Sequence, residues 1–165
     1  MDVAEPLERM VQQLHRQARP DAVMVGIHTG GVWLAEVLHA RLGLSAPLGT
    51  IDISFYRDDF TRIGLNPQVR ASALPEDVED RHVILVDDVL HTGRTVRAAL
   101  NELFSYGRPA SVLLAVLVER DGRELPIQAD VVGQHLSLGL QQYVELKGPE
   151  ALRLVILDRG SGRPT

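Results

Sequence analysis

The chain has 165 residues, 45% of them hydrophobic, which suits one globular domain with a sizeable core. Its 17 basic and 22 acidic residues give a net charge of −5, so the chain as a whole offers no general attraction for nucleic acid. The absence of cysteine excludes disulfides and thiolate zinc sites. No apolar run is long enough to span a bilayer and no signal-peptide core is present, so we expect a soluble cytoplasmic protein without membrane contact.

The first third of the chain predicts alternating helices and strands. Apolar residues spaced at i, i+3, i+4 and i+7 predict an amphipathic helix over residues 6–18. A buried strand is expected at 22–27, and the sequence His28-Thr29-Gly30-Gly31 then leads into an apolar helix. Alternation with period two predicts a strand over 49–56.

Residues 60–80 show no regular pattern and contain several Gly, Pro and charged residues. A passive connection of this length is uncommon in a compact domain, and we interpret it as an active-site lid. A strand at 82–87, an amphipathic helix ending near Gly107 and a strand at 111–118 follow. Shorter strands are expected near 129–132, 142–146 and 153–157.

These elements predict an α/β fold, in which a mostly parallel twisted sheet carries helices on both faces. We expect the short late strands to form a small hood at about 119–145. Residues 1–158 would then be a single domain, and the tail at 159–165, rich in Gly, Arg and Pro, would be disordered.

The most informative segment is 83–95, where an aliphatic strand leads to two adjacent carboxylates, Asp87 and Asp88. The loop that follows offers backbone N–H groups, the Thr92 and Thr95 hydroxyls and the Arg94 guanidinium, just where a helix begins. The unpaired N–H groups at a helix N-terminus bind anions, so this loop is suited to a phosphate.

Asp87 and Asp88 would repel a phosphate unless they face something else. Carboxylates accept hydrogen bonds from the hydroxyls of a ribose, and their oxygens also suit Mg²⁺, which is commonly shared with substrate phosphates. The alternative is an acidic turn that only closes the strand. The Thr-Gly-Arg-Thr sequence that follows the pair favours the binding interpretation.

Segment 83–95 resembles the phosphoribosyl pyrophosphate (PRPP) signature of type I phosphoribosyltransferases. Across most of its length the chain resembles, more narrowly, the PyrR family, whose members regulate pyrimidine operons and are also uracil phosphoribosyltransferases. The matching segments are Val25–Ile27, Asp52–Asp59, Val83–Leu100, Gly107–Ala110, Leu114–Val118 and Arg123–Ile127.

This resemblance implies transfer of a phosphoribosyl group from PRPP to uracil, giving UMP and pyrophosphate. It also implies Mg²⁺ as cofactor, bound by PRPP and, as a further option, by Asp87 and Asp88. It implies catalytic roles for Arg57 and Asp88. The expected ribose and 5′-phosphate residues are Asp87, Asp88, Val89, Leu90, His91, Thr92, Gly93, Arg94 and Thr95. The expected pyrophosphate residues are Thr29, Gly30, Gly31 and Arg57, and the expected base or hood residues are Arg120 and Gly133.

The chain departs from the family at two places. The pyrophosphate loop usually reads Lys-Thr-Arg-Gly, whereas here it is His28-Thr29-Gly30-Gly31, which removes or weakens two positive charges. The usual Gly-Lys-Asn-Ile-Pro-Thr-Ser stretch of the hood is replaced by residues 133–139, which contain no lysine. Two alternatives therefore stay open. One is a catalytically weak, uridine-nucleotide-sensing regulator that binds RNA, and the other is a phosphoribosyltransferase for a purine base or orotate.

The resemblance also implies partners. These are PRPP, uracil, UMP or UTP, an mRNA leader as a further option, and other copies of the chain in a homodimer or homotetramer. The basis for RNA binding in the sequence is limited, because the chain has one lysine, Lys147, and its arginines lie among acidic residues.

Overall fold

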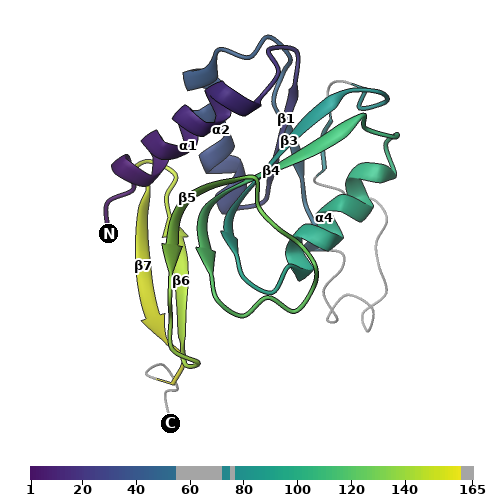
Figure 1. Ribbon diagram of the computed structural model, residues 1–165. Coiled ribbons are helices and arrows are strands. Elements are labelled where there is room, and N and C mark those ends of the chain that lie inside the picture. Colours follow the sequence, from purple (N-terminus) through teal and green to yellow (C-terminus); the bar gives the residue numbers. More distant parts are fainter. Residues whose placement is uncertain (55–71, 75–76, 161–165) are drawn as a thin grey trace.

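The computed structural model describes residues 1–54, 72–74 and 77–160. Its centre is a five-stranded sheet with the order β2-β1-β3-β4-β5, in which every neighbouring pair is parallel (Figure 1). The strands of this sheet are β1 (Val23–Ile27), β2 (Gly49–Ile51), β3 (His82–Leu90), β4 (Ser111–Arg120) and β5 (Val131–Leu136).

Helices cover both faces of the sheet. Helices α1 (Ala4–Gln17) and α2 (Gly30–Leu42) pack on one face, and α4 (Arg94–Phe104) packs on the other (Figure 1). Successive strand residues alternate between the two faces, so Ile84 belongs to the core beneath α1 and α2, and Leu85 to the core beneath α4. Burial on both faces explains why these strands are continuous aliphatic runs, as expected from the sequence.

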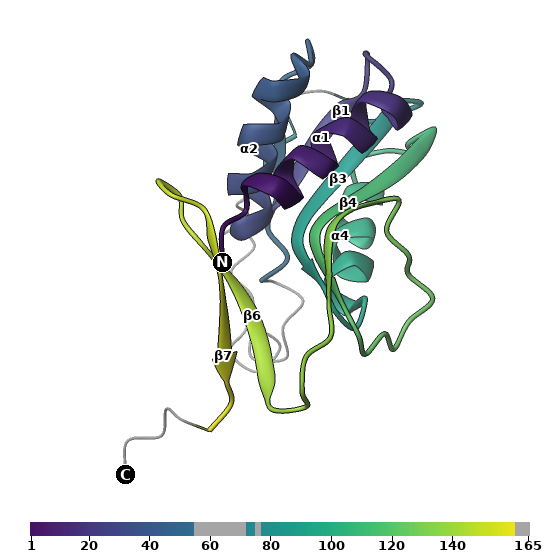
Figure 2. The same cartoon turned by 60° about the vertical axis from the view of Figure 1, so that its left-hand side comes forward.

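A second, smaller sheet consists of β6 (Gln142–Lys147) and β7 (Arg153–Asp158), which form an antiparallel pair. Figure 2 shows this hairpin projecting from the main sheet, with the N-terminus of the chain beside it. The Met1 ammonium group donates to the Leu154 carbonyl at 2.7 Å, and the Leu154 amide donates back to Met1. Val144, Leu146 and Leu154 are buried in the core shared with α1 and α2, which anchors the hairpin to the body of the fold.

The small sheet expected from the short late strands is present, but it consists of β6 and β7. The strand expected near 129–132 is β5, and it extends the parallel sheet instead of joining the small sheet. Helix α1 lies along it. The Gln13 side chain donates to the carbonyl of Val132 at 2.8 Å and accepts from its amide at 3.2 Å. Helix α1 therefore satisfies backbone groups of a sheet-edge strand that would otherwise be open to pairing.

The segment after β2 also differs from expectation. Strand β2 ends at Ile51 and does not continue through 54, and residues 55 and 56 lie outside the described part. At the far end of the expected lid, Ala73 forms two backbone hydrogen bonds with Thr50, and Val78 is fully buried in the core beneath α4. The described residues 72–74 and 77–80 at the carboxyl-terminal part of the 60–80 segment therefore pack against the body of the fold, and the lid stays a prediction. Residues 60–71, 75 and 76 lie outside the described part, as does most of the expected tail, residues 161–165.

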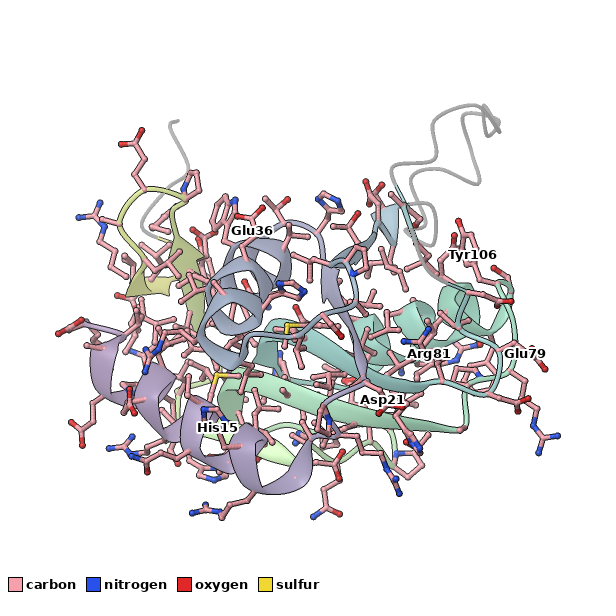
Figure 3. All side chains as sticks on the ribbon, turned by 90° about the horizontal axis from the view of Figure 1, so that it is seen from above. His15, Asp21, Glu36, Glu79, Arg81 and Tyr106 are labelled. Carbon is pink, nitrogen blue, oxygen red and sulfur yellow. The ribbon has the colours of Figure 1, made fainter. Side chains whose placement is uncertain are left out.

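At the amino-terminal end of the sheet, hydrogen bonds join the segments that precede the strands. Arg81 donates to the Asp21 carbonyl oxygen at 3.0 Å, and both residues lie where β3 and β1 begin (Figure 3). Glu79 accepts a hydrogen bond from the Arg108 amide at 2.7 Å. Among the described residues, no helix is long and apolar enough to cross a membrane.

Candidate active site

The strand order places a binding site at the carboxyl ends of β1 and β3. These adjacent strands continue into helices on opposite faces, β1 into α2 and β3 into α4, and ligands of open α/β sheets bind where connections diverge in this way. A cavity of about 730 Å³ opens at this point. Its described lining comprises His28, Thr29, Gly30, Trp33, Asp52, Ile53, Ser54, Asp87, Asp88, Val89, Arg94, Thr95, Ala98, Glu145 and Leu146.

The acidic pair lies near the carboxyl end of β3. Asp87 is only 4% exposed, and its Oδ1 accepts the Asp88 amide at 2.9 Å. Asp88 is half-buried and accepts the Val89 amide at 2.8 Å. Burial, and then the neighbouring Asp88 carboxylate, raise the pKa of Asp87 well above its ordinary value. Ribose hydroxyls that donate to this pair, or a cation beside it, would favour its ionised form.

Helix α4 begins beside the acidic pair with donors suited to an anion. Its N-cap is Gly93, with φ of +95°, and this residue has no side chain to cap the first amides. The first turn contains no acidic residue. The Arg94 amide donates to the Thr92 hydroxyl at 3.2 Å, and Thr95 lines the cavity. The partial positive charge of the helix N-terminus therefore faces the site, as the sequence predicted.

A second loop, residues 121–127, holds this anion-binding loop in place. Arg123 donates to the His91 carbonyl at 3.0 Å, and the Leu125 amide donates to the Thr92 carbonyl at 3.1 Å. Glycine is favoured at position 93 by its φ of +95°, and a Cβ there would also lie 3.1 Å from the Ile127 side chain, which would have to shift slightly. The Arg-Glu-Leu-Pro-Ile segment was visible in the sequence, but this role was not predicted.

Arg94 contacts a carboxylate from the same second loop. Its Nη2 lies 3.2 Å from Glu124 Oε1, and the two side chains are 61% and 50% exposed. An ion pair this exposed contributes little to stability. A bound phosphate would therefore compete for Arg94 at low cost.

The loop after β1 brings two glycines against β3. The N-cap of α2 is Thr29, no acidic residue occupies the first turn, and the His28–Thr29 peptide bond is cis. A Cβ on Gly31 would lie 2.6 Å from the Val86 carbonyl oxygen, and one on Gly30 would lie 2.3 Å from Asp88 Oδ2. Gly31 is therefore required for close approach to the β3 backbone, whereas the space beside Gly30 is occupied by the Asp88 carboxylate, the end of a side chain.

The structure brings together most of the residues predicted for PRPP. Thr29, Gly30, Asp87, Asp88, Val89, Arg94 and Thr95 line the cavity. Gly31 and Leu90 pack behind it, while His91, Thr92 and Gly93 form the adjoining loop. Arg57 lies outside the described residues.

The two residues predicted for the base do not reach this cavity. Arg120 is buried, donates to the Gln142 carbonyl at 2.9 Å and lines two other cavities. Gly133 is packed between β4 and α1, since a Cβ there would lie 2.7 Å from the Leu117 carbonyl oxygen and 2.9 Å from that of Pro6. Gly133 lies in β5, which joins the main sheet beneath α1, and it is not among the described lining residues of this cavity.

The cavity is also lined by residues that the sequence did not predict for the site. They are Glu145 and Leu146 of β6 and Trp33 of α2. Trp33 does pack against the core, and a Cβ on Gly148 would lie 2.9 Å from its ring. No local pattern in the sequence indicated that the hairpin and α2 would meet here.

The donor set fits a magnesium ion only when a substrate completes its coordination. The described residues contain no cluster of three or more His, Cys, Asp or Glu side chains placed to hold a metal ion. Asp87 and Asp88 nevertheless present carboxylate oxygens to the cavity. Mg²⁺ commonly binds through one or two carboxylates together with substrate phosphates and water, and this pair fits that arrangement.

The parallel sheet, the buried acidic pair and the donor-lined helix N-terminus define a phosphoribosyltransferase. Residues 2–143 match the phosphoribosyl transferase domain family, and the chain belongs to it. Within it, the chain belongs to the PyrR family. It is 63% identical over 147 residues to the bifunctional protein PyrR of Nitrosococcus oceani, covering 88% of this chain and 83% of the relative. It is 58% identical over 155 residues to the bifunctional protein PyrR of Pseudomonas paraeruginosa, covering 92% and 91%.

Solved structures show the same fold in more distant proteins. The hypoxanthine phosphoribosyltransferase of Trypanosoma cruzi superimposes with a TM-score of 0.69 at 21% identity, covering 95% of this chain and 94% of that one. The purine phosphoribosyltransferase of Pyrococcus horikoshii gives a TM-score of 0.63 at 22% identity, covering 81% and 82%. The predictions of an α/β phosphoribosyltransferase fold and of PyrR membership are confirmed.

Proposed function

We propose that this chain transfers the phosphoribosyl group of PRPP to N1 of uracil, giving UMP and pyrophosphate. The observation that carries the proposal is one cavity of about 730 Å³ faced by the acidic pair of β3 and by the N-termini of both α2 and α4. PRPP is a ribose with a phosphate at one end and a pyrophosphate at the other. The two helix N-termini can bind these two anionic groups, and the carboxylate pair can accept hydrogen bonds from the ribose hydroxyls.

The 5′-phosphate would bind at residues 92–95, and Asp87 and Asp88 would accept hydrogen bonds from the ribose hydroxyls. Pyrophosphate would lie at the backbone amides of Thr29, Gly30 and Gly31, and Arg57 keeps its proposed role beside it. In the reaction the C1′–oxygen bond to pyrophosphate breaks, the bond from C1′ to uracil N1 forms, and the N1 proton passes to water. Mg²⁺, when bound, would neutralise charge on the pyrophosphate. The chain's own task is to hold the ribose while positive charge develops on it.

The base would lie between Trp33 and the β6 residues Glu145 and Leu146. These side chains border the cavity on the side where α2 meets the hairpin. A flat apolar ring from Trp33 suits stacking against a pyrimidine. This placement replaces the one expected from Arg120 and Gly133.

Incubation of the purified chain with Mg²⁺, PRPP and each of uracil, hypoxanthine, guanine and orotate tests the proposal, with chromatography to identify the nucleotide. We expect UMP with uracil and little product with the other bases. Asp88→Asn should abolish turnover. Asp21→Asn, the same change at the opposite end of the sheet, should leave it intact (Figure 3). A nucleotide only from a purine or orotate would overturn the base assignment, and no product from any base would overturn the enzymatic role.

A second candidate function is that of a regulator that senses uridine nucleotides and binds an RNA leader as a homodimer or homotetramer. One observation favours it. Among the described lining residues, Arg94 is the only arginine or lysine, and it already pairs with Glu124. On α1, Arg9 is bound to Glu5 and to the Gly133 carbonyl, whereas His15 and Arg16 are exposed (Figure 3). RNA retention that weakens as salt rises, measured beside UMP binding, tests this function.

A further inference from the structure

A second cationic cavity lies on the far side of the loop that precedes α4. Its volume is about 190 Å³, and it shares no described lining residue with the active-site cavity. Three basic side chains line it, namely His91 from that loop, Arg120 from the end of β4 and Arg159 after β7. Leu138 and Leu140 form an apolar side, and Asp121, Gly122 and Gln142 complete the lining.

Arg120 is the unusual member of this group. Its side chain extends from a residue only 8% exposed, and one guanidinium nitrogen, Nη1, donates to the Gln142 carbonyl at 2.9 Å. Its Nε has no hydrogen-bond partner, and it is the one buried side-chain nitrogen or oxygen of the described residues in that state. A buried donor without an acceptor costs free energy, so an acceptor group within reach of this guanidinium would be stabilising.

The charges around the cavity favour an anion. Burial lowers the pKa of His91, and Arg120 and Arg159 lower it further, with a smaller contribution from Arg123. Glu124 acts in the opposite direction, and Asp121 is the acidic member of the described lining. Arg159 lies over the Tyr143 ring, with its Cζ 5.9 Å from the ring centroid, which orients its guanidinium beside the cavity.

The two leucines of the lining indicate that the ligand carries an apolar group beside its anionic one. Leu140 is 95% exposed, although large apolar side chains are usually covered, and it stands beside Leu138 at the mouth of the cavity. We infer that this cavity is a second anion site, which takes a phosphate monoester with its phosphate on Arg120 and Arg159 and its ester group against Leu138 and Leu140. A ligand held there would touch His91, and therefore the same loop that is proposed to hold the 5′-phosphate of PRPP.

Calorimetric titration of the full chain tests this inference, with the active site first saturated by PRPP and Mg²⁺ in the absence of any base. The probes are inorganic phosphate and phenyl phosphate. We expect each to bind once per chain, with phenyl phosphate binding more tightly. Arg159→Gln should weaken both by about tenfold or more, the effect of losing one charge-assisted hydrogen bond. Leu140→Ser should weaken phenyl phosphate alone.

Arg153→Gln is the matched control, since Arg153 is an exposed arginine at the other end of β7. A second readout is the imidazole signal of His91 by NMR. Phosphate should raise the pKa of His91 in the wild-type chain and in Arg153→Gln, but not in Arg159→Gln. Failure of both probes to bind the PRPP-saturated chain, or equal binding by the wild type and Arg159→Gln, would overturn the site. If Arg153→Gln weakened binding of the probes as much as Arg159→Gln, the site would also be overturned, because the loss would then be a general effect of surface charge.

Discussion

Gly30→Ala tests whether the active-site geometry depends on the contact between the loop after β1 and the acidic pair. A Cβ at position 30 would lie 2.3 Å from Asp88 Oδ2 and 2.9 Å from its carboxyl carbon. Carbon and oxygen atoms that are not bonded do not approach this closely, and about 1 Å of movement is needed to reach normal contact. Asp88 is half-buried and borders the cavity, so its carboxylate should move instead of the packed backbone.

A displacement of this size at a positioning group costs about 10- to 100-fold in kcat/KM, or about 1.4–2.7 kcal/mol of transition-state stabilisation. The free energy of unfolding should change by much less, because Asp88 can turn toward solvent. Any larger residue at position 30 would meet the same contact and would require a different Asp88 position.

The assay is UMP formation from PRPP and uracil, with PRPP affinity measured separately by calorimetry. Because the effect is transmitted through Asp88, Gly30→Ala should change PRPP affinity little in an Asp88→Ala background, and a double-mutant cycle on the calorimetric PRPP affinities measures this coupling. Gly139→Ala is the matched control, since a Cβ there meets only Gln142 at 3.4 Å, an ordinary contact. An unchanged kcat/KM in Gly30→Ala, or losses that simply add in the double variant, would refute the reasoning.

Three further changes test charge and packing around the same site. Asp87→Asn should raise the free energy of unfolding of the unliganded chain at neutral pH and weaken PRPP binding. The raised pKa of Asp87 means that native stability is full below the ordinary carboxyl range and falls as the pH rises toward the raised value. Urea denaturation at several pH values checks this, and an identical pH dependence in variant and wild type would contradict it. Gly26→Ala should lower the free energy of unfolding by about 1–3 kcal/mol. A Cβ there would lie 2.9 Å from the Gly31 carbonyl oxygen and push α2 away from β1. An unchanged free energy of unfolding in urea denaturation would show that α2 can shift freely. Leu38→Ala should lower the free energy of unfolding by about 2–5 kcal/mol, since loss of this fully buried side chain leaves a cavity. The PRPP affinity of the folded variant, measured by calorimetry, should stay the same.

Local sequence was sufficient for the order of the elements and for the central motif. Segment 83–95 contains its own signals, because the aliphatic run requires burial on both faces while Gly93 and the hydroxyl residues favour a helix start. The expected helices and strands along 82–118 are therefore confirmed, and so are the parallel sheet with helices on both faces and the family. The ends of parallel strands meet at one edge, which is why the sequence also brought the 28–31 loop to the acidic pair.

Contacts between distant segments could not be obtained in this way. Whether the strand near 131 joined the sheet or the hood depended on the fit of α1 to its edge, through Gln13 and Val132. The bracing of Thr92 by residues 124 and 125, the arrival of Glu145 beside Trp33 and the Asp88 carboxylate against Gly30 depend equally on the packing of the whole chain. Periodicity and residue type report which side of an element is buried, whereas the partner that covers it is selected by shape and by satisfaction of polar groups across the assembled fold.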